Sequence, residues 1–457
     1  MLSALLALVA AATLQIHHFQ IPVIPGQDIP VAAVTAPEGE VPALQVAAKG
    51  LTCKALRRYY VKDGYLYVQL DGSRIKRIDK PFQLQIKAKG CAVEESGERQ
   101  HRLAVKVRTG GDDGVAAYRI PGLVTTHRGT LVASYDIRHN SAADLQGDID
   151  VGISRSTDGG RTWGPMIVAM DMGCWGGLPE DQNGIGDPCL LVDENTGDLL
   201  LFAAWTHGKP GQAAWWTAGD GFDPETTPQL MMARSVDDGL TWSEPVNLTR
   251  QVKQEAWHFT FQGPGRGITM ADGTLVVPFQ HQEADRTPAA GIMYSQDHGL
   301  TWHVHEYAKI NTTESQVAEI APGELMLNMR DNRKTGRAVY VTRDLGRTWE
   351  PHVSDGALTE PVCMASLLRV KAADNALGRD LLLFSNPADP QDRRNLTIQA
   401  SLDGGRTWTG RILLDEGYSW GYSCLTMIDR HTIGILYESS MAHMTFQAVP
   451  LKDLRWE

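Results

Sequence analysis

Ser401-Leu402-Asp403-Gly404-Gly405-Arg406-Thr407-Trp408 carries a pattern, Ser/Thr-x-Asp-x-Gly-x-Thr-Trp, that the chain uses five times. The copies occupy residues 156–163, 235–242, 295–302, 342–349 and 401–408. Successive Asp residues are separated by 79, 60, 47 and 59 positions. A repeat of this spacing predicts stacked units or the blades of a propeller.

Each copy of the motif has the composition of a hairpin turn. The Asp carboxylate can accept hydrogen bonds from N–H groups of its own turn, and the Gly can adopt a positive φ. The Trp offers a large apolar side chain that can anchor the hairpin to its neighbour. The motif therefore predicts a structural role, and function has to be argued from other residues.

The composition limits the classes of function. The chain has 457 residues, of which 42% are hydrophobic and 21% charged, as in a large globular protein. A net charge of −11 argues against nucleic acid as a partner. The fourteen His and six Cys show no zinc-binding spacing, so we expect no catalytic metal and no cofactor. The sequence does not decide whether Cys53 forms a disulfide with Cys91, or Cys174 with Cys189.

Three regions follow one another along the chain. The apolar run at residues 4–14 is too short to span a bilayer and looks like the core of a secretory signal, although no Lys or Arg precedes it. We therefore expect a signal-like segment and lead-in over 1–21, no transmembrane span, and a secreted or periplasmic protein.

Residues 22–50, rich in Pro, Ala and Val, predict an irregular lead-in. Strands with alternating apolar and polar residues are expected from about residue 51. We assign 22–104 to an N-terminal β module, either structural or carbohydrate-binding.

The region from about residue 105 onward contains short strands, turns and three arginines in distinctive frames. Arg119 lies in Tyr118-Arg119-Ile120-Pro121, Arg330 ends Leu325-Met326-Leu327-Asn328-Met329-Arg330, and Arg393 precedes Arg394-Asn395-Leu396-Thr397-Ile398. With these frames, and with five motifs similar to the Asp box, the chain resembles the sialidase (neuraminidase) family of bacterial and animal type. The resemblance implies an all-β fold, with a six-bladed β-propeller over 105–457 preceded by the small β domain.

The resemblance also implies a binding site for the carboxylate of sialic acid. Arg119, Arg330 and Arg393 match the arginine triad of the family, and three guanidinium groups can offer several charge-assisted hydrogen bonds to one anion. Glu438 matches the residue that orients the first arginine. Arg138 is a candidate contact of the sugar ring.

Asp144 matches the general acid/base of the family and lies in the stretch that follows Arg138. Asp136 and Asp148, in the same stretch, are the alternatives. An acid in this role has to stay partly protonated, so we expect partial burial or a like charge beside it.

Tyr422 matches the nucleophile, and Glu314 the base that takes its phenolic proton. Tyr418 and Tyr437 are the rival tyrosines. The anomeric carbon of sialic acid carries a carboxylate, which would repel a carboxylate nucleophile, whereas a neutral phenol avoids that repulsion. A phenol with a pKa near ~10 needs an adjacent base at neutral pH.

These residues predict a retaining exo-α-sialidase acting on sialylated glycoproteins, glycolipids and oligosaccharides. The alternatives are a trans-sialidase or an intramolecular, anhydro-forming trans-sialidase on the same frame, and a sialic-acid-binding propeller without turnover. We expect a monomer. Whether the stretch Gly186-Asp187-Pro188 reaches the cleft as a loop stays open.

Overall fold

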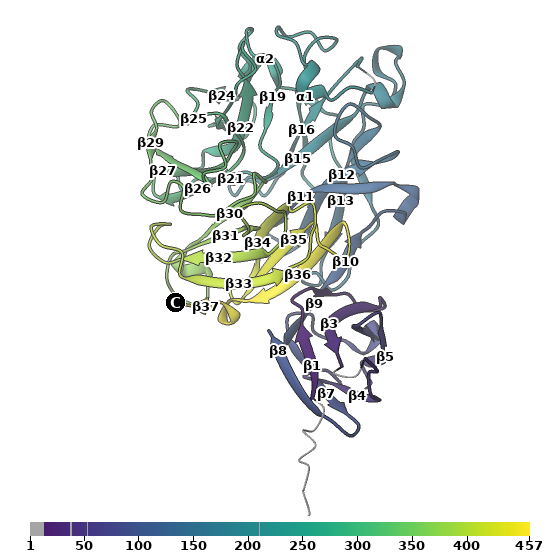
Figure 1. The fold of residues 1–457 in the computed structure, drawn as a ribbon. Coiled ribbons are helices and arrows are strands. Elements are labelled where there is room, and N and C mark those ends of the chain that lie inside the picture. The colour runs from purple at the N-terminus through teal and green to yellow at the C-terminus, as the bar shows by residue number, and fades with distance from the viewer. Residues whose placement is uncertain (1–12, 37–38, 53, 210) are drawn as a thin grey trace, which may run out of the picture. The chain divides into compact units, whose positions relative to one another are not determined.

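The computed structural model describes residues 13–36, 39–52, 54–209 and 211–457, and their regular secondary structure consists almost entirely of strands (Figure 1). The α-helices of the described residues are single turns, α1 (Ala214–Thr217) and α2 (Thr249–Val252). The expected all-β class is therefore confirmed. No helix among these residues is long and apolar enough to cross a bilayer. Most of the signal-like run, residues 4–12, lies outside the described residues.

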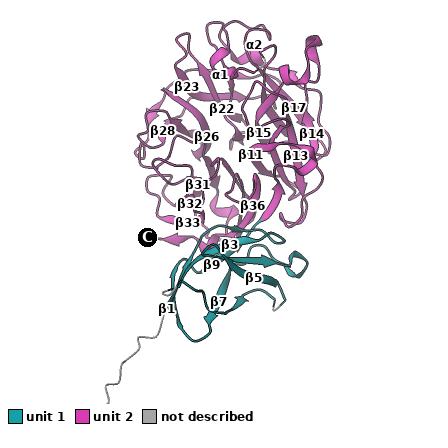
Figure 2. Ribbon diagram, turned by 45° about the vertical axis from the view of Figure 1, so that its right-hand side comes forward, with its two compact units in different colours: residues 1–104 teal, residues 105–457 magenta. Residues whose placement is uncertain are grey.

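The chain divides into two compact units, residues 1–104 and 105–457 (Figure 2). In the first unit, one sheet has the strand order β5-β6-β3-β1-β8 and the other the order β2-β9-β7-β4. The strands are β1 (Thr13–His18), β2 (Pro22–Val23), β3 (Ile29–Thr35), β4 (Leu44–Lys49), β5 (Leu56–Lys62), β6 (Tyr65–Leu70), β7 (Phe82–Ala88), β8 (Ala92–Gly97) and β9 (Gln100–Leu103).

The irregular lead-in that the sequence suggested is wrong. Strand β3 pairs with β1 and β6, and β4 pairs with β7, so residues 13–50 already supply strands of both sheets. The pattern misleads because β3 carries the strand-breaking Pro30 at a register shift, where the ladder is interrupted. A tight turn at Asp63-Gly64 connects β5 and β6, and both residues have positive φ, 51° and 79°.

The second unit contains six sheets among its described residues. The first is β11 (Ala117–Thr125), β12 (Leu131–Arg138), β13 (Ile149–Ser156) and β14 (Ile167–Met170). The second has the order β18-β17-β16-β15-β20, with β15 (Ile185–Val192), β16 (Leu199–Trp205), β17 (Gln229–Ser235), β18 (Val246–Asn247) and β20 (Gly265–Arg266). The third contains β19 (Thr260–Gln262), β21 (Ile268–Thr269), β22 (Leu275–Gln282), β23 (Pro288–Ser295), β24 (His303–Val304) and β25 (Lys309–Ile310).

The remaining sheets complete the unit. The fourth is β26 (Thr312–Ala321), β27 (Glu324–Asp331), β28 (Ala338–Thr342) and β29 (Glu350–Pro351). The fifth is β30 (Ser366–Val370), β31 (Leu381–Pro387), β32 (Leu396–Ser401), β33 (Gly410–Asp415) and β37 (Arg455–Trp456). The sixth joins β34 (Ser423–Asp429), β35 (Thr432–Tyr437) and β36 (Met444–Pro450) to β10 (Val105–Arg108), so it pairs the beginning of the unit with its end.

The first strands of these sheets contact one another in a cycle. Strand β11 contacts β34 and β15, β26 contacts β22 and β30, and β30 contacts β34, while β15 contacts β21 of the third sheet. Each sheet is thus covered on both faces by its neighbours, which explains why all eight residues of β12 are buried. Polar residues on such strands have to find partners inside the protein, and these strands carry much of the candidate site.

The five repeated turns connect adjacent strands at the outer side of five sheets and share one hydrogen-bond pattern. In the copy at 295–302, Oδ1 of Asp297 accepts from Ser295 Oγ at 2.8 Å and from Thr301 N at 2.9 Å. Ser295 Oγ in turn accepts from Gly299 N at 2.8 Å. The predicted Asp-centred turn is confirmed, and the last residue of this copy, Trp302, is 1% exposed and packs edge-on against Phe202 of the preceding sheet.

Candidate active site

Three arginines from distant parts of the chain lie around the side chain of Tyr422. The guanidinium carbons of Arg119 and Arg393 lie 5.5 and 5.7 Å from the centre of its ring. Nη1 of Arg330 lies 3.3 Å from its hydroxyl. The structure therefore brings together the three arginines and the tyrosine that the sequence singled out, from β11, β27, the β31–β32 connection and the residue before β34.

Glu438, which follows β35 and is 1% exposed, holds the first arginine in place. Its Oε1 accepts from Arg119 Nε at 2.7 Å and from the backbone N–H of Ile120 at 3.1 Å, and its Oε2 accepts from Tyr422 N at 3.0 Å. Ile120 has a φ of 62°, an unfavourable region for a β-branched residue, and Pro121 follows it at a register shift of β11. One carboxylate thus fixes both the side chain of Arg119 and the local backbone.

Arg119 is 8% exposed, and its guanidinium carbon lies 4.6 Å from the ring centre of Trp420. Burial lowers the pKa of Arg119, but the Glu438 carboxylate more than offsets this, so the pKa is raised above its usual value. The group is a permanent cation that is covered by an aromatic ring.

Tyr422 and Glu314 are in direct contact. The phenol, 5% exposed, donates a short hydrogen bond to Glu314 Oε1, while Glu314 Oε2 accepts from Arg330 Nη1 at 2.6 Å. Burial, reinforced by the Glu314 carboxylate, raises the pKa of Tyr422 well above its usual value, and Arg330 and Arg393 counteract only part of this rise. The phenol is therefore protonated, with a carboxylate oxygen placed to receive its proton.

The two rival tyrosines lie in other surroundings. Tyr437 is fully buried and its hydroxyl donates to Gln447 Oε1 at 3.1 Å. Tyr418 is 66% exposed and stacks beneath Arg394 at 5.6 Å. Tyr422 is the one of the three that contacts Glu314.

Arg393 differs from the other two arginines in its partners. Its Nη1 donates to the carbonyl oxygen of Trp420 at 3.0 Å and its Nη2 to that of Val362 at 3.3 Å. Among the described residues it forms no ion pair with a carboxylate. Because a partly buried cation without a counter-charge is costly, this side of the site favours an anionic ligand.

Asp144 lies on the connection between β12 and β13, and its side chain is 80% exposed. Its Oδ1 accepts from Arg138 Nη1 at 2.7 Å and lies 3.9 Å from Arg119 Nη1. Desolvation raises the pKa of Asp144, but Arg138 and Arg119 outweigh it and lower the pKa below its usual value. Desolvation of this carboxyl, one of the two features that we expected, is therefore present, but the two arginines outweigh its effect on the pKa. The acid/base role of Asp144 stays a prediction.

Arg138 ends β12 and connects Asp144 to a buried acidic pair. It is 2% exposed, and its Nε and Nη2 donate to Asp136 Oδ2 at 3.0 and 2.8 Å. Asp136 is 1% exposed, so it acts as a partner of Arg138. Asp148, the other alternative to Asp144, lies beside His139 and Asp150, which are described below.

Asp187 is a residue of this site that the sequence left undecided. It belongs to strand β15, not to a loop, and its backbone N–H donates to Asp136 Oδ1 at 2.8 Å. Burial, with Asp136 and Asp144 as further negative charges, raises the pKa of Asp187 well above its usual value. The sequence offers one signal for Asp187, which precedes a proline as Ile120 does. In the structure both residues have positive φ and lie at a register shift of the first strand of their sheet.

The chain is similar to proteins of known family. Residues 129–435 match the family model described as BNR repeat-like domain. A sialidase of Bacteroides fragilis (strain YCH46) is 60% identical over 365 residues, which cover 79% of this chain and 67% of that protein. A sialidase of Micromonospora viridifaciens is 34% identical over 359 residues, covering 76% of this chain but 54% of that protein.

Solved structures show the same likeness. The structure of Hadza microbial sialidase Hz136 superimposes with a TM-score of 0.86 at 45% identity, covering 96% of this chain and all of that chain. An intramolecular trans-sialidase from Ruminococcus gnavus shares the fold, with a TM-score of 0.62 at 20% identity, over 77% of this chain and 98% of that chain.

Proposed function

The chain belongs to the sialidase family of glycoside hydrolases, and we propose that it is an exo-α-sialidase that removes terminal sialic acid from glycoconjugates with retention of configuration. The observation that carries this proposal is the meeting of Arg119, Arg330 and Arg393 around the Tyr422–Glu314 pair. Hydrolysis of terminal sialic acid needs a cationic site for one carboxylate beside a nucleophile with its own base, and this group of residues supplies both.

The same proposal includes the architecture and the location of the protein. We assign 105–457 to a six-bladed propeller, which the six sheets and the cyclic contacts of their first strands support. Residues 22–104 would form a separate β module, and 1–21 would direct the protein to the periplasm or the outside of the cell. The substrate would be a sialylated glycoprotein, glycolipid or oligosaccharide, bound by a monomer.

Binding begins with the sugar carboxylate. Arg119 and Arg330 are each already paired with a glutamate, whereas Arg393 is held by carbonyl oxygens alone. The substrate carboxylate would supply the missing negative charge, and the planar guanidinium groups would orient it. The anomeric carbon next to this carboxylate would then lie over the Tyr422 hydroxyl.

In the first step, the Tyr422 oxygen forms a bond to the anomeric carbon while the glycosidic C–O bond breaks. The phenolic proton passes to Glu314, and the departing oxygen takes a proton from Asp144. Asp144 has a lowered pKa in the free protein because Arg138 and Arg119 face it. A bound carboxylate and the exclusion of water from the exposed Asp144 side chain would both raise that pKa, so substrate binding would prepare the acid.

In the second step, Asp144 accepts a proton from water as the water oxygen attacks the anomeric carbon. The bond to Tyr422 breaks, and the proton held by Glu314 returns to the phenolate. Two displacements at the same carbon restore the original configuration. If a glycan hydroxyl or a hydroxyl of the same sugar replaced water, the products would be a transferred sialyl group or an anhydro sugar.

The test is turnover of a fluorogenic sialoside by the full chain and by three variants, Tyr422→Phe, Glu314→Gln and Arg393→Ala. Hydrolysis by the wild type and losses of about 100-fold or more in each variant are expected. Mass spectrometry of the products separates free sialic acid from an anhydro or transferred product. No turnover by the folded wild type would contradict the proposal, and an anhydro or transferred main product would replace hydrolysis by the corresponding transfer.

A further inference from the structure

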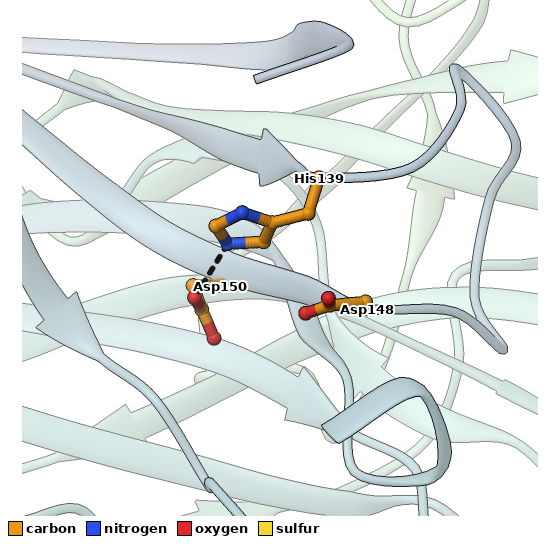
Figure 3. A group of neighbouring side chains, drawn as sticks. All are labelled: His139, Asp148 and Asp150. Carbon is orange, nitrogen blue, oxygen red and sulfur yellow. Dashed lines mark hydrogen bonds and ion pairs between the residues drawn. The ribbon is translucent and has the colours of Figure 1, made fainter. Parts of the chain in front are cut away.

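Three side chains of the kinds that bind metal ions lie close together outside the residues assigned to catalysis. Figure 3 shows His139, Asp148 and Asp150 with their side chains turned toward one another. One ligand atom from each lies within 4.8 Å of the other two, and His139 Nε2 is 2.8 Å from Asp150 Oδ2. The side chains are partly buried, with 36% of His139 and 16% of Asp150 exposed.

The donor atoms of this group match a particular class of metal ion. One imidazole nitrogen with two carboxylates suits a divalent transition-metal ion such as Zn²⁺, whereas Ca²⁺ and Mg²⁺ favour oxygen atoms alone. With metal–ligand distances of about 2.0–2.2 Å, ligand atoms of one ion lie roughly 3 Å apart. The distances between the ligand atoms of His139, Asp148 and Asp150 differ from that value by no more than about 2 Å. Modest side-chain rotations would therefore complete the site.

The surroundings also favour a cation with bound water. Asp150 experiences the negative charges of Asp148 and Asp171, a repulsion that a cation would relieve. Asp148 lines an open pocket of about 190 Å³ together with Asn140 and Asp144. His139 and Asp150 do not line this pocket, so water from it would reach a bound ion on the Asp148 side.

His139 and the two carboxylates lie where a bound metal ion would hold together the ends of the connection between β12 and β13. His139 and Asp148 stand at the two ends of the connection between β12 and β13, and the backbone N–H of His139 donates to the Asp148 carbonyl oxygen at 3.1 Å. Asp144 lies within this connection and is largely exposed. A metal held by both ends would restrict the segment that carries Asp144, without touching the substrate.

We propose that His139, Asp148 and Asp150 bind one divalent transition-metal ion that clamps the base of the 139–148 connection. The site would be structural and separate from the groups that carry out the proposed sialidase reaction. Binding can be measured without substrate, so its failure is distinguishable from failure of the proposed function.

The experiment is titration of the metal-free full chain with Co²⁺, followed by visible absorption, and with Zn²⁺, followed by equilibrium dialysis and metal analysis. The wild type should bind one ion per chain with a Co²⁺ absorption band typical of nitrogen and oxygen ligands. His139→Gln, Asp148→Asn and Asp150→Asn should each weaken binding by about tenfold or more. Circular dichroism and Tm establish that each variant is folded.

The matched control is His127→Gln. His127 also pairs with a carboxylate, Glu194, at 2.6 Å, but both side chains are about half exposed and no further carboxylate is grouped with them among the described residues. This variant should bind Co²⁺ as the wild type does. Hydrogen exchange of the 139–148 amides should slow on addition of Zn²⁺ in the wild type and in His127→Gln, and should not change in Asp150→Asn.

Two results would overturn the proposal. The first is the absence of stoichiometric binding by the wild type, which would leave only weak, adventitious metal at the surface. The second is unchanged affinity in folded Asp148→Asn and Asp150→Asn, which would place any bound ion elsewhere.

Discussion

Arg119 Nε lies 2.7 Å from Glu438 Oε1, and this buried ion pair connects the first of the three arginines to the tyrosine. The other oxygen of Glu438 accepts from the backbone N–H of Tyr422 at 3.0 Å. A change at residue 438 should therefore disturb both Arg119 and Tyr422, the proposed carboxylate ligand and the proposed nucleophile.

The first prediction concerns Glu438→Gln, which keeps the size of the side chain and removes its charge. Because Arg119 would remain buried without its counter-ion, we expect a loss of about 3 kcal/mol of stability and a fall in kcat/KM of about 100-fold. Thermal unfolding and steady-state kinetics measure these effects.

The matched control for this change is Glu324→Gln. Glu324 pairs with Arg343 at 2.6 Å, but the arginine side chain is 60% exposed. We expect a change in stability of less than about 1 kcal/mol and unchanged kinetics. Equal effects of the two substitutions would contradict the role assigned to Glu438.

The second prediction separates Asp144 from its neighbour Asp148. Asp144→Asn removes the proposed proton donor, so natural glycosides with poor leaving groups should lose about 100-fold or more in kcat. An aryl sialoside, whose leaving group needs less protonation, should lose much less in the first step. The measurement is kcat on a sialyl oligosaccharide and on the aryl substrate, with Asp148→Asn as the comparison. A leaving-group-dependent loss in Asp148→Asn, and not in Asp144→Asn, would move the acid to residue 148.

The site shows why some parts could be predicted from the sequence and others could not. Tyr422 and Glu314 lie in recognisable local frames, and the structure places them in contact although 108 positions separate them. The surroundings of Asp144 could not be predicted in this way. Its charge balance depends on Arg138, six residues before it, and on Arg119, which approaches it only after β11 and β12 pair.

The fold shows the same division. The repeated turns are predictable because the hydrogen bonds of the Asp carboxylate are local, from Ser295 to Thr301 in one copy. Strands β3 and β4 are hard to predict because their partners β6 and β7 lie further along the chain, and because β3 contains Pro30 and both strands contain two Ala residues, which are depleted in strands. Gly186 and Pro188, which flank Asp187, are typical of a loop, whereas in β15 they mark a strand irregularity.

The third prediction concerns the repeated turn. Asp297 accepts hydrogen bonds from Ser295 Oγ, Leu300 N and both the N–H and the hydroxyl of Thr301. Asp297→Ala should lower the free energy of unfolding by about 2 kcal/mol, at roughly 0.5–1.5 kcal/mol for each net hydrogen bond. The value of kcat/KM should not change, because the turn contacts no residue of the candidate site.

Asp272→Ala serves as the comparison for the turn, since Asp272 accepts one backbone hydrogen bond, from Thr274 N at 2.9 Å. We expect a loss of less than about 1 kcal/mol. Denaturant unfolding measures both variants, and a loss of activity in folded Asp297→Ala would show that the turn has more than a structural role.

The fourth prediction concerns acid stability of the first unit. His101 is 1% exposed, and burial, with a smaller contribution from His18, lowers its pKa from 6.5 to about 3. Because the folded state disfavours the protonated ring, the stabilising effect is complete above about pH 6.5 and is lost as the pH falls toward 3. A difference of one pKa unit between the folded and unfolded states changes the free energy of unfolding by about 1.4 kcal/mol.

We therefore expect the Tm of the wild type to fall more steeply between about pH 7 and pH 4 than that of His101→Gln, which has no titrating group at this position. Differential scanning calorimetry across this range measures the difference. Parallel Tm curves for the two proteins would mean that His101 does not titrate between the folded and unfolded states.

The most direct test of the central claim is to trap the sialyl-enzyme with a 2,3-difluorosialic acid and to locate the adduct by peptide mass spectrometry. The account predicts a covalent sialyl group on the peptide that contains Tyr422, attached to its phenolic oxygen, and no adduct in Tyr422→Phe. An adduct on Glu314 or on another residue, formed by an active wild-type enzyme, would contradict it.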